Sequence, residues 1–156
     1  MHQVAPNDPR TIHAERNDAA WQELREEREP WLGQRFERAR RLVQLDRKGA
    51  YVFEGGESVS QVTSLMGYDG EEDEKTLLLG YATLAFPEVE DLLRENQTTY
   101  PKACALGVIA RGQYRHELFE DDFPVVQEDD RWVHWARFEP LKDLRKRISK
   151  RMGEIQ

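Results

Sequence analysis

The run from His116 to Glu120 is the nearest approach to a catalytic or metal-binding motif in this sequence. His116 and Glu117 begin like the His-Glu-x-x-His helix of zinc enzymes, in which two histidines one turn apart bind the metal. Glu120 occupies the position of the second histidine, and the segment lacks the apolar stripe of a helix. We therefore expect no metal and no cofactor here, and interpret the run as an acidic strand end entering a loop.

Other reactive side chains also have structural interpretations. Cys104 lies in the apolar run Ala103–Ala110, where burial raises the pKa of a thiol and makes it unreactive. His134 alternates with Trp132 and Ala136, which favours a hydrogen-bonded core histidine. The acids of residues 69–74 lack the ligand alternation and the sixth-position glycine of a calcium loop. The sequence thus favours a non-enzymatic protein, with an enzyme using Glu117 or Glu120 beside His116 as an alternative.

Charge is distributed unevenly along the chain. Residues 51–140 contain 19 acids and 7 bases, whereas residues 1–50 contain 10 bases and 9 acids. Residues 141–156 contain 6 bases and 2 acids. Such a distribution informs the choice of binding partners and says little about the fold.

The acids of the middle block gather in clusters near aromatic side chains. Charge of one sign steers association with an oppositely charged partner, and apolar anchors prolong the complex. The leading hypothesis is therefore a protein that captures and inhibits a basic protein such as a toxin or nuclease, as immunity proteins and antitoxins do. The predicted partner-binding residues are Asp69, Glu71, Glu72, Asp73, Phe119, Glu120, Asp121, Asp122, Phe123, Glu128, Asp129, Asp130 and Trp135.

Two basic segments offer an alternative, which is binding to nucleic acid phosphates. Residues 34–48 carry a net charge of +4, and residues 141–151 carry +5. The acidic middle block would repel a polyanion, and these bases can instead pair with acids inside the protein. We therefore favour pairing of these bases with acids inside the protein over binding to nucleic acid.

Length and composition indicate one domain over residues 1–156, with a mobile or loosely packed segment at residues 1–16. Cys104 is the sole cysteine, so no intramolecular disulfide can form. The N-terminus lacks the apolar stretch of a secretory signal, and no apolar run is long enough to span a bilayer. We expect a cytoplasmic protein, and no membrane partner.

Helical patterns occupy both ends of the chain. A helix capped near Asn17 should be interrupted or kinked at Pro30, and the apolar spacing from Leu32 to Val43 predicts a helix that ends at Gly49. Pro87 should open a short helix, and Pro140 a final one with Leu141, Leu144, Ile148 and Met152 on one face.

Strand patterns occupy the middle of the chain. Ala50–Phe53, Cys104–Ala110 and Trp132–Phe138 resemble strands, and Ser58–Met66 is interpreted as part of a hairpin. Thr76–Phe86 fits helix and strand equally well. The predicted class is therefore α+β, a mainly antiparallel sheet with N-terminal and C-terminal amphipathic helices packed on it.

Overall fold

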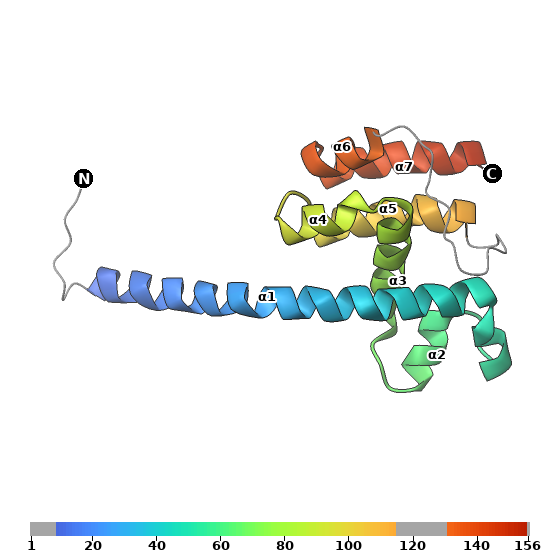
Figure 1. The fold of residues 1–156 in the computed structure, drawn as a ribbon, viewed down its shortest axis with the longest axis horizontal. Coiled ribbons are helices and arrows are strands. Elements are labelled where there is room, and N and C mark those ends of the chain that lie inside the picture. Colours follow the sequence, from blue (N-terminus) through green and yellow to red (C-terminus); the bar gives the residue numbers. More distant parts are fainter. Residues whose placement is uncertain (1–8, 115–130, 156) are drawn as a thin grey trace. The chain divides into compact units, whose positions relative to one another are not determined.

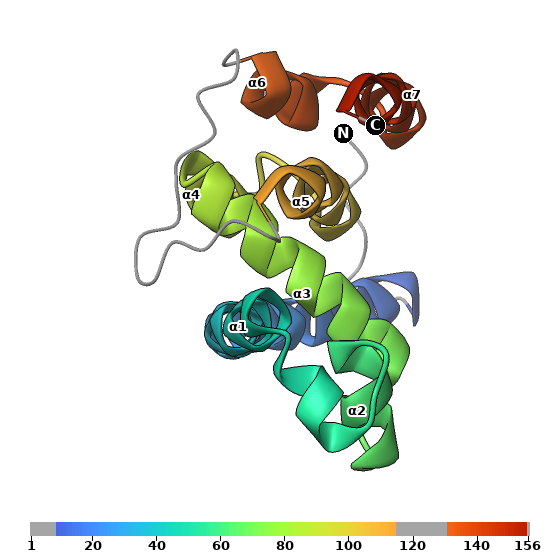
Figure 2. The same cartoon turned by 90° about the vertical axis from the view of Figure 1, so that its right-hand side faces the viewer.

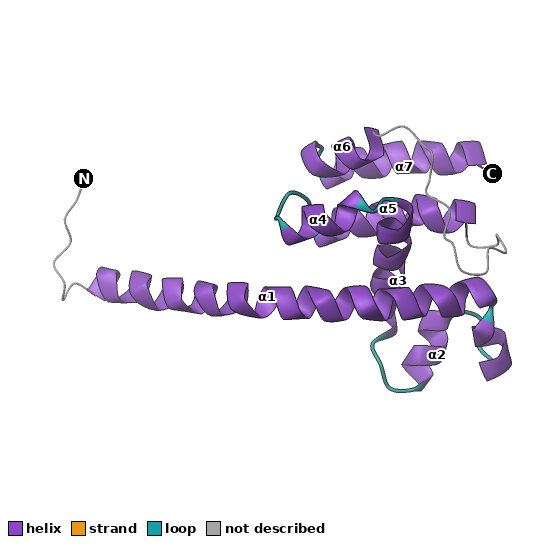
Figure 3. Ribbon diagram, viewed as in Figure 1, coloured by secondary structure: helices purple, strands orange, loops and turns teal. Residues whose placement is uncertain are grey.

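The computed structural model describes the backbone of residues 9–114 and 131–155, and the side chains of residues 17–52, 54–112 and 131–154. Within these ranges every element is a helix, and no strand occurs (Figures 1 and 3). The predicted α+β class with its antiparallel sheet is therefore wrong, and the described fold is all-α. The elements are α1 (Pro9–Lys48), the 3₁₀ helix η1 (Ala50–Glu54), α2 (Val59–Leu65), α3 (Gly70–Ala85), α4 (Glu88–Arg94), α5 (Tyr100–Tyr114), α6 (Arg131–Phe138) and α7 (Leu141–Ile155).

The chain forms two compact units, residues 1–34 and residues 35–156. In the first unit the described residues comprise only the N-terminal part of α1. The second unit contains the rest of α1 and every other described element. Nearly all buried apolar side chains belong to this second unit, from Phe36 to Ile148.

Helix α1 ends where its sequence predicts. Its last residue is Lys48, and Gly49 follows with a φ of 62°, a left-handed conformation that glycine adopts without strain. The helix continues through Pro30, where an interruption was expected. A proline removes one amide donor, but the hydrogen-bond ladder on either side of it can persist.

The core of the second unit is built on close contact between α3 and α5. A Cβ atom added to Gly107 would lie 1.9 Å from the carbonyl oxygen of Leu78, so the two helix backbones meet at this glycine. Gly80 meets Ala39 of α1 in a similar way. Helix α5 also packs against α7, so α5 lies between α3 and α7 (Figures 1 and 2).

Every predicted strand is helical in the structure, and in α5 burial on several sides conceals the helical periodicity. Cys104–Ala110 lies in α5, which is buried on several sides and therefore has no clear polar face. Trp132–Phe138 belongs to α6, where Trp132 and Ala136 are one turn apart and buried. Ala50–Phe53 forms most of η1, and Ser58–Met66 contains α2. Thr76–Phe86, which fitted both states, is helical as far as Ala85.

The helices expected after Pro87 and Pro140 are confirmed as α4 and α7. On α7, Leu144 and Ile148 are buried in the core as their spacing predicts. None of the helices in the described ranges combines the length and the apolar character that crossing a membrane requires.

Candidate functional site

The four acids predicted at residues 69–73 are mostly engaged within the protein. Asp69 caps α3, because its side chain accepts hydrogen bonds from the amides of Glu71 and Glu72 at 3.0 and 3.2 Å. Asp73 is only 4% exposed and accepts two hydrogen bonds of 2.8 Å from Arg38 of α1. Glu71 is exposed, as Asp69 is, and its carboxylate has no such partner within the described residues.

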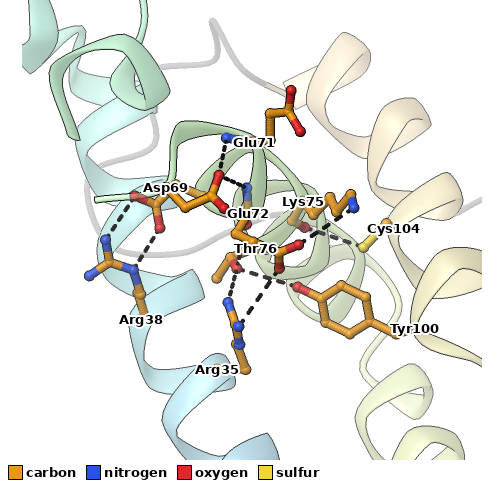
Figure 4. A network of polar contacts seen from close by, with 10 residues as sticks. Arg35, Arg38, Asp69, Glu71, Glu72, Lys75, Thr76, Tyr100 and Cys104 are labelled. Carbon is orange, nitrogen blue, oxygen red and sulfur yellow. Dashed lines mark hydrogen bonds and ion pairs between the residues drawn. The ribbon is translucent and has the colours of Figure 1, made fainter. Parts of the chain in front are cut away.

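A polar network continues from these acids toward α5 (Figure 4). Glu72 forms ion pairs with Arg35 at 3.7 Å and with Lys75 at 3.5 Å. Arg35 also donates to the hydroxyl of Thr76, which lies 3.3 Å from the hydroxyl of Tyr100. The network therefore joins the second half of α1, α3 and α5, and its acids stabilise the fold.

Burial and hydrogen bonding oppose each other at Asp73. Burial disfavours the charged carboxylate, but hydrogen bonds from Arg38 and Thr63 and the positive charges of Arg38 and Arg35 outweigh it and lower the pKa of Asp73. The hydrogen bonds to Asp73 and its negative charge, with a smaller contribution from Tyr68, raise the pKa of Arg38. Both groups are thus charged at neutral pH, as expected of a partly buried ion pair.

Intramolecular pairing of the basic segment 34–48 is confirmed by these contacts of Arg35 and Arg38, and further by the ion pair of Arg40 with Glu90 at 3.6 Å. In α7, Arg147 pairs with Glu139 at 2.7 Å and lies over the ring of Trp135. Four other cations of α7 are exposed and form no ion pair with a described residue; they are Lys142, Arg145, Lys146 and Lys150.

Trp135 is partly buried and already has partners. Its ring meets that of Trp132 edge to face, with centroids 5.0 Å apart, and the guanidinium of Arg147 lies 4.1 Å from its centroid. This side chain therefore helps to hold α6 and α7 together. Residues outside the described ranges include all the other predicted site residues and the acid–base alternative: His116, Glu117, Phe119, Glu120, Asp121, Asp122, Phe123, Glu128, Asp129 and Asp130.

Burial raises the pKa of the Cys104 thiol to about 12, as the apolar sequence around it predicts. Its Sγ atom donates to the carbonyl of Lys75 at 3.3 Å. His134, expected in the core, is instead exposed, with its ring 4.8 Å from that of Phe138. No group of His, Cys, Asp and Glu side chains among the described residues could hold a metal ion.

Large apolar side chains are exposed along the N-terminal part of α1. Trp21 is 59% exposed, Leu24 is 55% exposed and Trp31 is 43% exposed. Their separations of three and seven residues place them on one side of the helix. We call these three residues the N-terminal stripe. An exposed row of this kind is typical of a helix that binds another molecule.

Acidic side chains accompany the N-terminal stripe. Residues 17–34 contain five acids and two arginines. Glu27 lies three residues after Leu24 and four before Trp31, so it borders the stripe, and Glu23 lies one turn before Glu27. The helical spacing of these apolar residues can be seen in the sequence. Whether such residues form a core face or an exposed stripe depends on the fold, so the sequence alone did not identify this site.

Comparison with known proteins returns no match for this chain, whether against family models, curated proteins or solved structures.

Proposed function

We propose that this protein is a helical, non-enzymatic binding protein that captures a basic protein partner through the N-terminal stripe. The supporting observation is the exposure of Trp21, Leu24 and Trp31 along one side of a helix rich in acids. The partner class is the one that the sequence suggests. The proposed binding surface is not the one predicted from the sequence, because most of the acids at residues 69–73 form contacts within the protein.

Energetics favour a protein partner for this surface. Tryptophan is enriched among the residues that dominate binding energy, because a large ring loses much contact with water and little conformational freedom. Most of the stability of a helix in a protein comes from packing of its apolar side, so covering the stripe would also stabilise this part of α1. The acids on the same helix would steer a basic surface toward the stripe and repel an acidic one.

Site-specific photo-crosslinking in the native cell tests this function. A benzophenone amino acid is placed at Leu24 in one variant and at Glu26 in a matched control. Two residues rotate a helix by roughly 200°, so Glu26 faces away from the stripe. We expect the Leu24 variant to form a covalent adduct with a basic protein, identified by mass spectrometry, and the Glu26 variant to form much less of it.

Trp21→Ala combined with Trp31→Ala should then abolish the Leu24 adduct, and high salt should reduce it. Adducts of equal yield from both positions would refute the proposal. So would an adduct with an acidic protein, or one that contains only a second copy of this chain.

A further inference from the structure

A second candidate site lies in the unit of residues 35–156, independent of the N-terminal stripe. A pocket of about 520 Å³ opens between α3, α5 and α7. This volume falls in the range of small-molecule sites, roughly 300 to 1,000 Å³. Five of its ten lining residues are apolar, and Leu78 of α3, Val108 of α5 and Ile148 of α7 supply one wall each. The interior therefore suits a hydrocarbon group.

The charged residues of the pocket are both cations. Lys75 enters from α3 and Arg145 from α7, and no lining residue is acidic. Arg145 forms no ion pair with a described residue, and Lys75 has only a long surface pair with Glu72. Such exposed pairs contribute little, so both cations are available to a ligand. The hydroxyl of Ser149 adds a hydrogen-bond donor to the same lining.

We propose that this pocket binds a single-chain amphiphile with an anionic headgroup, specifically a medium-chain carboxylate. The alkyl chain lies against Leu78, Val108 and Ile148, and the carboxylate is held by Arg145 and Lys75. The thiol of Cys104 also lines the pocket, but its raised pKa keeps it protonated, so it contributes apolar surface and no negative charge that would repel the ligand.

Titration with decanoate below its micellar concentration tests the assignment, with binding followed by the amide NMR signals of Ala105 and Val108 and by calorimetry. We expect the chemical shifts of these amide signals to change with added decanoate and to reach a plateau. Octanoate should bind roughly 15-fold more weakly, because it buries two fewer methylene groups. Decanol, which has the same chain and no charge, should bind about tenfold more weakly than decanoate, because a charged hydrogen bond is lost.

Three variants sharpen the test. Arg145→Gln should weaken decanoate binding about tenfold, whereas Lys146→Gln, its exposed neighbour outside the pocket, should leave binding unchanged. Val108→Trp should fill the pocket and abolish binding. If the Val108→Trp variant fails to fold, Arg145→Gln still tests the proposal, because it changes only a surface residue. Equal affinity for decanol, equal effects of the two α7 variants, or a preference for anionic lipid vesicles over monomeric decanoate would overturn the proposal.

Discussion

Asp73 illustrates at the residue scale how an acid of the sequence becomes part of the fold. Its carboxylate is buried and accepts both hydrogen bonds of the Arg38 guanidinium. We expect Asp73→Asn to lower the free energy of unfolding by about 1–3 kcal/mol, because Arg38 loses its charged acceptor. Glu71→Gln, an exposed change in the same helical turn, should alter it by no more than about 0.5 kcal/mol. Urea denaturation of both variants measures the difference.

The same residue predicts a pH dependence. The pKa of Asp73 is lowered in the folded protein from its ordinary value of 3.8, so the unfolded chain binds the proton more readily. The stabilising contribution is therefore complete above the unfolded pKa and is lost as the pH falls through the folded pKa. The stability gap between wild type and Asp73→Asn should be constant from pH 7 to about pH 5 and shrink below about pH 4. A gap that persists unchanged at pH 2 would contradict this account.

The crossing of α3 and α5 at Gly107 governs packing at the scale of elements. Alanine is the better helix former by about 1 kcal/mol. Its Cβ atom, however, would meet the backbone of Leu78, which cannot move without shifting the whole of α3. We expect Gly107→Ala to destabilise the protein by about 1–3 kcal/mol, as overpacking does. Thermal denaturation measures the change.

Gly33 of α1 provides the matched control for that substitution. It is also helical, but a Cβ atom added there would have nothing within 4 Å apart from its chain neighbours and the nearby backbone of its own helix. Gly33→Ala should therefore be neutral or stabilising by up to about 1 kcal/mol. Equal effects at the two glycines would show that helix propensity, and not the contact of α5 with α3, decides the outcome.

A buried ionic network connects three helices at the scale of the whole molecule. Asp46 of α1 accepts a hydrogen bond of 2.6 Å from Tyr81 of α3 and two from Arg111 of α5, at 3.1 and 3.3 Å. Arg111 also donates to Glu74 at 2.6 Å. Burial disfavours the guanidinium charge, yet these acids raise the pKa of Arg111 overall. The network fixes how α1, α3 and α5 meet within residues 35–156.

Asp46→Asn should therefore cost about 1.5–3 kcal/mol of unfolding free energy, because Arg111 loses a buried charged acceptor and keeps only Glu74 as a countercharge. Adding Arg111→Met should recover part of that loss, since the second change removes a partly buried guanidinium that has only one acid left to pair with it. Glu37→Gln, which breaks only the exposed pair with Arg41, should cost less than about 1 kcal/mol. Chemical denaturation of the three variants gives these values, and no recovery in the double variant would contradict the role assigned to Arg111.

The sequence by itself determined the features that depend on local chemistry. Gly49 ends α1, and Pro87 and Pro140 precede α4 and α7, because glycine and proline restrict the backbone wherever they stand. The apolar stripe of α7 was also predictable, since the other side of that helix faces water. The environment of Cys104 followed in the same way from the apolar residues around it.

Tertiary structure alone decided the secondary structure of the most buried segments and the roles of the charges. In α5 apolar residues recur on several sides, so its sequence does not distinguish a buried helix from a buried strand. Arg38 lies 35 residues from Asp73, and Tyr81 and Arg111 lie 35 and 65 residues from Asp46, so no local pattern identifies these pairs. The exposure of Trp21 and Leu24 is likewise settled by which residues the fold covers, because burial depends on contacts between distant parts of the chain.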